Sequence, residues 1–190
     1  HVAERADIGG QREALIAVEI PEQKGSFLRF CETLGRRGVT EFNYRYNPGA
    51  AAQLFVGLAL SEGRKEKEAV LKSLRDTGYP VIDMSENEMA KLHVRYMVGG
   101  HAHGIENERL FRFEFPERPG ALLKFLNAIG TQWNITLFHY RNHGSDYGRV
   151  LAGVQIPAAE SVDFDLHVRE LKYVYAEETE NPAYRRFLGG

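Results

Sequence analysis

The chain has 190 residues, of which 43% are hydrophobic and 26% are charged, as in an ordinary globular protein. Its formal net charge of −2 gives no strong field that would favour nucleic acid or an anionic membrane surface as a partner. No apolar run approaches the roughly 18 residues of a membrane helix, and the first residues lack the apolar core of a signal peptide, so a cytoplasmic protein is expected.

The first part of the chain alternates strand and helix patterns. Leu15–Ile20 is a short apolar β run that ends at Pro21. Gly25 then opens a helix whose apolar residues recur at i, i+3, i+4 and i+7, which draws one buried stripe. Those residues are Phe27, Phe30, Cys31 and Leu34. The elements predicted next are the strands Thr40–Tyr46 and Gln53–Leu60, joined by the turn Asn47–Gly49, the helix Arg64–Asp76 and the strand Tyr79–Met84.

The same order returns about 95 residues later. Residues 108–130 repeat residues 13–35, with Glu114 in the place of Glu19 and Gly120 in the place of Gly25. The equivalent elements are the strand Leu110–Phe115, a helix opened by Gly120 with its stripe at Leu122, Phe125, Leu126 and Ile129, the strands Ile135–Arg141 and Arg149–Ile156 around the turn Asn142–Gly144, the helix Val162–Leu171 and the strand Tyr173–Tyr175. A fixed offset through a whole unit indicates a tandem duplication.

The order βαββαβ, present twice, predicts an α+β protein of two ferredoxin-like units, each a four-stranded antiparallel sheet with two helices on one face. Uncovered sheet edges favour side-by-side pairing of the two units. Residues 11–84 form the first unit and 108–190 the second. The connector 85–107 contains a predicted helix, with Ser85 as N-cap and Glu88 at the capping-box position, and a glycine-rich loop that holds the boundary.

The sequence contains no pattern of catalytic residues. G-x-S-x-G, H-E-x-x-H, Walker and dinucleotide motifs are absent. Cys31, the single cysteine, lies on an apolar helix stripe, which favours a buried structural thiol over a nucleophile. His101 and His103 stand near Glu106 and Glu108 in a weak metal-ligand pattern, for which a solvated linker is the better interpretation. The acidic residues 177–180 are likewise interpreted as a solvated face. We therefore expect neither a catalytic site nor a metal site.

Two glycine turns are the stronger signal. Pro21–Phe27 and Pro116–Leu122 each place a glycine where a helix begins, which leaves backbone N–H groups open to a carboxylate. The alternative is that the glycine only makes the turn. In the same way Tyr44 and Tyr140 are either ordinary strand residues or place hydroxyl groups at a ligand, and their spacing does not decide between the two.

The motif Pro-Glu-x-x-Gly before an amphipathic helix, within βαββαβ, resembles the ACT family of amino-acid-sensing domains. The segments EIPEQKGSFLRFCETLG, VTEFNYRY, EMAKLHVRYMVGG, FEFPERPGALLKFLNAIG, NITLFHYR and ENPAYRRFLGG look like the C-terminal regulatory region of biosynthetic threonine dehydratase. This resemblance covers residue 11 to the terminus and implies an allosteric region that binds isoleucine as feedback inhibitor and valine as its antagonist. Residues 1–10 are then expected to be the remnant of an interdomain linker.

The full-length family member uses pyridoxal phosphate to convert L-threonine to 2-oxobutanoate and ammonia, and is a tetramer. The cofactor-binding domain has no counterpart in this sequence, so we expect no cofactor and no turnover from this chain alone. The partners implied are the catalytic domain of the same polypeptide and further copies of the chain, with a dimer expected for this region. By position, the resemblance implies that the effector is bound by Gly25, Phe27, Arg37, Asn43, Tyr44, Gly120, Leu122, Leu126, Ile129, His139 and Tyr140.

Two other functions stay open from the sequence. The chain can be an assembly module whose sheet edges pair subunits, with no ligand of its own. It can also be a small free-standing enzyme on a scaffold that hosts many functions, although no catalytic constellation supports this. A saturable response to isoleucine separates the regulatory function from the first alternative.

Overall fold

The computed structural model describes residues 12–21, 23–35, 37–46, 51–93, 104–118, 120–141 and 146–189. Several sequence predictions fall outside these residues. They are the linker remnant 1–10, the turns 47–49 and 142–144, His101, His103 and all of the glycine-rich loop before Gly104. Within the described ranges, no helix is both long and apolar enough to cross a membrane.

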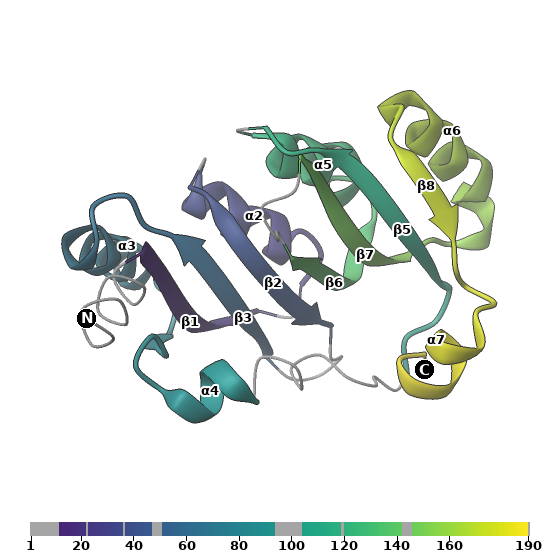
Figure 1. Cartoon of the computed structure of the whole chain (residues 1–190). Helices are drawn as coiled ribbons and strands as arrows, with labels where there is room; N and C mark the ends of the chain where they lie inside the picture. The colour runs from purple at the N-terminus through teal and green to yellow at the C-terminus, as the bar shows by residue number, and fades with distance from the viewer. Residues whose placement is uncertain are drawn as a thin grey trace.

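The βαββαβ order occurs twice, as the sequence predicts (Figure 1). The first unit consists of β1 (Glu13–Ile20), α2 (Ser26–Leu34), β2 (Val39–Arg45), β3 (Ala52–Ala59), α3 (Arg64–Asp76) and β4 (Val81–Asp83). The second consists of β5 (Glu108–Pro116), α5 (Ala121–Gly130), β6 (Asn134–Arg141), β7 (Tyr147–Gln155), the 3-10 turn η2 (Ala158–Glu160), α6 (Ser161–Leu171) and β8 (Val174–Glu177). Two short helices, α4 (Glu88–Leu92) and α7 (Pro182–Phe187), follow the two units.

The two units share one sheet. Its eight strands run in the order β4-β1-β3-β2-β6-β7-β5-β8, and all the pairs are antiparallel. The expected side-by-side pairing is therefore confirmed, and it takes place between β2 and β6, where Asn43 lies opposite His139. We call this strand pair the seam. Because equivalent strands meet there antiparallel, the two units are related by an approximate two-fold axis through the seam.

The four long helices cover one face of this sheet (Figure 1). Their apolar stripes and the inward strand residues form one core that continues across the seam, where Phe27 of α2 packs on Phe138 of β6 with 5.1 Å between ring centroids. Helices α4 and α7 contact the other face. Ala90 of α4 packs against residues of β1 and β3, and Tyr184 of α7 packs against Leu110 and Leu137.

Two predictions for the connector are wrong. The N-cap of α4 is Asn87, whose side chain accepts a hydrogen bond from the Ala90 amide at 3.0 Å, so Glu88 is the first helical residue and closes no capping box. The Ser85 hydroxyl oxygen instead accepts from the Leu15 amide, because Ser85 is buried beside β1. Asn181 caps α7 in the same way as Asn87 caps α4, accepting from the Ala183 amide at 2.9 Å.

Glu108 does not belong to a solvated linker. It is the first residue of β5, and its carboxylate accepts two hydrogen bonds from the guanidinium of Arg45 of β2, at 2.7 and 3.0 Å. Only 3% of each side chain is exposed. The hydroxyls of Thr136 and Tyr184 donate to the same carboxylate. This correction arises because the pairing of β2 with β6 brings Arg45 to the second unit.

Only part of the acidic segment 177–180 is the solvated face that the sequence predicts: Glu177 and Glu180 are exposed, whereas Glu178 and Thr179 are half-buried. The segment is also held in place. Glu177 pairs with Arg109 of β5, and Glu178 pairs with Arg112 of the same strand. These ion pairs attach β8 and the start of the C-terminal tail to the strand beside them.

Candidate functional site

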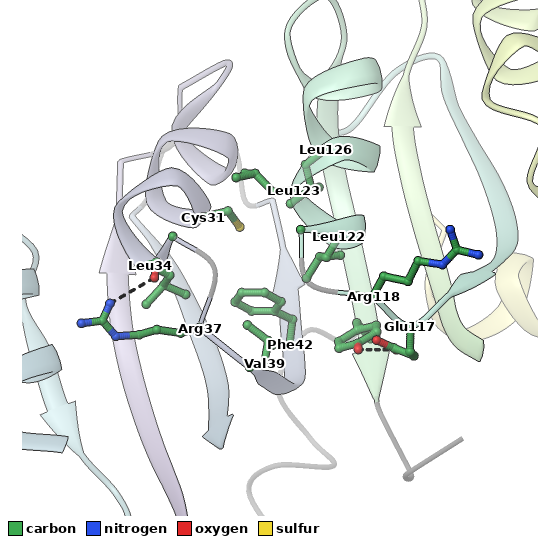
Figure 2. Close-up of a pocket in the computed structure, with 14 residues that line it drawn as sticks. Cys31, Leu34, Arg37, Val39, Phe42, Glu117, Arg118, Leu122, Leu123 and Leu126 are labelled. Atoms are coloured by element: carbon green, nitrogen blue, oxygen red, sulfur yellow. Dashed lines mark hydrogen bonds between the residues drawn. The ribbon is translucent and has the colours of Figure 1, made fainter. Parts of the chain in front are cut away.

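Helices α2 and α5 contact each other across the seam, and we call the line along which they meet the groove (Figure 1). A pocket of about 440 Å³ opens at one end of this groove, where the C-terminus of α2 meets the N-terminus of α5 (Figure 2). We call it the seam pocket. The residues lining it are Cys31, Leu34, Gly35, Arg37, Gly38, Val39 and Phe42 from the first unit, and Glu117, Arg118, Gly120, Leu122, Leu123, Leu126 and Tyr140 from the second. Both units thus contribute to one cavity.

The N-terminus of α5 opens on the seam pocket. Gly120 precedes the helix with φ +83°, a left-handed backbone conformation that a side chain would strain. Gly120 has no side chain to cap the helix, and the Ala121 N–H donates to the Arg118 carbonyl oxygen at 3.0 Å. The N–H groups of Leu122 and Leu123, in the first turn, have no acceptor within the helix. These N–H groups and the positive end of the helix dipole favour an anionic group such as a carboxylate.

The wall of the seam pocket is apolar. Leu122 of α5 faces Phe42 of β2, with Leu34 and Val39 beside that ring, and Leu126 follows one turn farther along α5 (Figure 2). Cys31 completes this wall, and burial raises the pKa of its thiol far above its usual range, so the thiol is neutral. The prediction of a buried thiol at Cys31 is confirmed. A branched aliphatic group fits such a surface because it loses no hydrogen bond when it leaves water.

A carboxylate stands at the edge of the seam pocket. The Tyr140 hydroxyl donates a hydrogen bond of 2.5 Å to Oε1 of Glu117, shown as a dashed line in Figure 2. Gly148 of β7 leaves room for this group, because a Cβ at Gly148 would collide with the Glu117 carboxylate. Glu117 is thereby oriented by a strand residue and accommodated by a glycine.

The two arginines in the lining lie at its rim. The Arg37 guanidinium donates to the Leu34 carbonyl oxygen at 3.3 Å and points away from the cavity (Figure 2). Arg118 is exposed, and its guanidinium extends away from Phe42 and Leu122 (Figure 2). The pocket thus offers helix N–H groups, a fixed carboxylate and an apolar wall, which together suit an α-amino acid with an aliphatic side chain.

Five of the effector residues expected from the resemblance line the seam pocket. They are Arg37, Gly120, Leu122, Leu126 and Tyr140. Six others lie elsewhere. Gly25, Phe27, Tyr44 and Ile129 lie toward the other end of the groove or in the core beneath it. Asn43 and His139 point to the opposite face of the sheet, where the Asn43 amide donates to Glu41.

Several lining residues are missing from the site expected from the sequence, Glu117 above all. The signal was present, since the repeat keeps a glutamate after the proline of both turns (Glu22 and Glu117), at a position where no core requires a carboxylate. Phe42 and Val39 carry no such signal, because a strand residue facing a core looks the same as one facing a pocket.

Other features of the described residues do not form a comparable site. No group of three or more His, Cys, Asp or Glu side chains among them is placed to hold a metal ion. A cavity of about 320 Å³ is lined by the first unit and α4. Another of about 400 Å³, beside the α3–β4 turn, is lined by the first unit alone.

Comparison with known proteins relates the whole chain to one group. A family described as the C-terminal regulatory domain of threonine dehydratase matches residues 4–94 and 99–188. The chain is 58% identical over 190 residues, 100% of its length, to biosynthetic L-threonine dehydratase IlvA of Escherichia coli (strain K12), and covers 37% of that protein. It is 42% identical over 195 residues to the mitochondrial threonine dehydratase of Saccharomyces cerevisiae, with 98% of this chain and 34% of that one covered. The chain thus spans just over a third of these relatives.

Among solved structures, the regulatory subunit of aspartate kinase from Thermus thermophilus, in its ligand-free form, aligns with 85% of this chain and 93% of its own. The TM-score is 0.34 at 13% identity, a likeness too low to support any argument.

Proposed function

The chain belongs to the family of C-terminal regulatory domains of threonine dehydratase, and we propose that its regulatory function is to bind L-isoleucine as feedback inhibitor, with L-valine as antagonist, in the seam pocket. The whole protein would then be a pyridoxal phosphate-dependent enzyme that converts L-threonine to 2-oxobutanoate and ammonia. Its catalytic part would come from polypeptide outside this chain, since the matched relatives are about three times as long.

One observation carries the proposal. The seam pocket joins an anion-binding helix terminus, a fixed carboxylate and an aliphatic wall within about 440 Å³, in the range of roughly 300–1,000 Å³ common for small-ligand sites. The α-carboxylate would meet the N–H groups of Leu122 and Leu123 in the first turn of α5, and the α-ammonium group would meet Glu117. The branched side chain would lie against Leu122, Leu126 and Phe42.

Regulation requires more than binding. Isoleucine and valine differ by one methylene, which a pocket distinguishes by only ~1–3 kcal/mol. Opposite effects from such similar ligands require that they favour different states of the protein, because a ligand with equal affinity for two states shifts neither. A pocket built by both units is suited to this, since a ligand between α2 and α5 bears directly on how the units sit at the seam.

The seam pocket does not fit pyridoxal phosphate. Among the described residues that line it there is no lysine, so none of them offers an amine to bind the aldehyde carbon of the cofactor. Its cations, Arg37 and Arg118, lie at the rim and point outward (Figure 2). We assign no catalytic step to this chain and place the cofactor in the part of the whole protein that lies outside it.

Calorimetric titration of the chain with L-isoleucine, L-valine and L-threonine tests the proposal. Saturable binding of isoleucine and valine is expected, with each displacing the other. Threonine should bind more weakly, because its hydroxyl would lose its hydrogen bonds to water against the wall of Leu122, Leu126 and Phe42. D-Isoleucine is the matched control, since it keeps the charges and side chain but cannot place all three groups at once. Absence of saturable binding by both branched amino acids would contradict the proposal.

Subunit assembly is the second function that an observation favours. The edge strand β8 has no neighbour on its outer side within the described sheet, and Val174 on it is 70% exposed. An open edge with an exposed apolar residue pairs readily with another chain. Sedimentation at rising concentration would show the dimer expected for this region, and a dimer without any amino-acid binding would favour assembly as its whole role.

A further inference from the structure

The duplication raises a question of symmetry. The two-fold relation at the seam gives the groove between α2 and α5 a second end, where the N-terminus of α2 meets the C-terminus of α5. Equivalent residues of the two units stand at the two ends, so the repeat alone would build two pockets. An inference about how many amino acids bind along the groove rests on the proposed function of the seam pocket.

An aromatic ring fills the second end. Phe27 of α2 is the counterpart of Leu122, and its ring stacks on Tyr44 with 4.8 Å between centroids and 9° between planes. The same ring packs on Phe138 at 5.1 Å. Phe27 and Tyr44 are only 3% and 4% exposed. By contrast, Leu122 is partly exposed in the seam pocket. The larger side chain takes the volume that the smaller one leaves open.

The C-terminal ends of α2 and α5 also differ: the end of α2 is open and the end of α5 is packed. Gly35, which follows α2 at the seam pocket, has open space where a Cβ would be. Its counterpart Gly130, at the end of α5, is packed. A Cβ there would lie 3.3 Å from Ile135 and 3.7 Å from Leu28. At the second end the C-terminus of α5 is therefore packed against Ile135 of β6 and Leu28 of α2, whereas the C-terminus of α2 has open space at the first end.

The strand residue beside the glycine turn also differs between the two units, being a glycine in β7 and an alanine in β3. Gly148 lies opposite Phe115 in the sheet and leaves room for the Glu117 carboxylate. The equivalent position of the first unit, opposite Ile20, is Ala52, which is buried. Its methyl group takes up the room that the second unit gives to a carboxylate.

We infer that this chain has one open amino-acid pocket, the seam pocket, and that Phe27 occupies the second one in place of a ligand side chain. Phe27 thereby sets the number of effector sites to one per chain. The exchange of two residues should then exchange the two ends: Phe27→Leu opens the closed end, and Leu122→Phe closes the open one.

Equilibrium dialysis of the whole chain against radiolabelled L-isoleucine counts the sites directly. The unchanged chain should bind one isoleucine. Leu122→Phe should bind none, and Phe27→Leu should bind a second, more weakly than the first because Ala52 keeps its methyl group. Circular dichroism establishes that each variant is folded.

Two matched substitutions serve as controls. Phe164→Leu removes the same atoms from α6, but Phe164 packs on Phe111 and Trp133 inside the second unit, away from the seam pocket, so one site should remain. Leu166→Phe adds a ring to an exposed position of α6 and should also leave one site. Two sites in the unchanged chain would overturn the inference and leave the proposed function standing. One site in folded Phe27→Leu would show that Phe27 is not the occupant. No binding in any variant would contradict the proposed function and the inference with it.

Discussion

Glu117 shows how a single residue gains a role from its surroundings. It stands in a turn, and the structure fixes it between the Tyr140 hydroxyl and the space above Gly148. A carboxylate that accepts one hydrogen bond from the protein keeps lone pairs free for a second donor. In the seam pocket that donor would be the ammonium group of the proposed effector.

Glu117→Gln tests this role. The amide oxygen can still accept from Tyr140, but the negative charge is lost. Hydrogen bonds to charged groups contribute about 1.5–3 kcal/mol, so the dissociation constant for L-isoleucine should rise roughly ten- to a hundredfold. Glu114→Gln, the same change at an exposed position of β5, is the control. Titration calorimetry gives both values, and an unchanged affinity in Glu117→Gln would remove Glu117 from the site.

Arg45 and Glu108 form the other residue pair that matters. Each is almost wholly buried, and they join β2 of the first unit to β5 of the second. Removing one partner of such a pair leaves a charge in the protein interior without its counter-ion. The Arg45 guanidinium also donates to the Leu188 carbonyl oxygen at 2.5 Å, so the pair holds the tail after α7 as well.

Arg45→Met should lower the free energy of unfolding by about 3–5 kcal/mol, because Glu108 stays buried without its cation. Arg112→Met removes an arginine that is 65% exposed in its pair with Glu178 and should change the same quantity by about 0–1 kcal/mol. Urea unfolding followed by circular dichroism measures both. Equal losses in the two variants would show that burial of the pair has no consequence for stability.

Among the elements, β8 is attached to its neighbours by ion pairs. Arg109 of β5 donates to Glu177 of β8 at 2.7 Å and to Asp165 of α6 at 3.0 Å, so one guanidinium links two strands and a helix. The hydrogen bond from Arg109 lowers the pKa of Glu177, against the opposing effect of partial burial, and the Thr179 hydroxyl adds to the lowering. Edge strands with a short ladder need such attachments.

The lowered pKa of Glu177 makes the stability of the fold depend on pH. Because the folded chain holds Glu177 ionised more readily than the unfolded chain, the unfolded state binds more protons in acid. The stability from this pair is fully present above the ordinary glutamate pKa of about 4.3 and is lost as the pH falls through the lowered, folded value. Urea midpoints of the native chain and Arg109→Met should therefore differ most near pH 6 and converge in acid.

Arg149→Met is the control for this series, since Arg149 is 85% exposed and stands 3.8 Å from Glu114. The urea midpoints of Arg149→Met should change with pH in the same way as those of the native chain. A difference between native chain and Arg109→Met that stays constant down to pH 2 would show that Arg109 acts by packing on Phe111 and Phe164, over whose rings it lies, and not by its charge.

At the scale of the whole molecule, the two units are expected to unfold together. The seam pairs β2 with β6 over Glu41–Arg45, the Glu41–Arg141 ion pair crosses it at 2.9 Å, and the aromatic core continues through Phe42 and Phe138. Separating the units would expose two strand edges and the facing sides of α2 and α5. A shared core of this kind makes unfolding a single cooperative step.

Differential scanning calorimetry should accordingly give one transition, with the calorimetric enthalpy equal to the van't Hoff enthalpy. Arg45→Met should move this transition to lower temperature without splitting it. Two resolved transitions in the native chain would show that the units fold independently and that the seam is a weak contact.

The sequence by itself determined the parts. The period of apolar residues and the glycine turns are local properties, so the strands, the helices and the duplication follow from them within one or two residues at most boundaries, and α3 (Arg64–Asp76) is predicted without error. The short helix α7 is not predicted, because Pro182–Phe187 is too short to show a helical period of apolar residues.

Only the tertiary structure decided how the parts meet. The pairing of β2 with β6 buried Glu108 under Arg45, made one sheet of two and placed Phe42 opposite Leu122 in a shared pocket. Which end of the groove stays open depends on pairs such as Phe27 with Tyr44 and Glu117 with Gly148. The members of each pair are brought together by strands distant in sequence, and the volumes of contacting side chains cannot be compared until the fold sets them side by side.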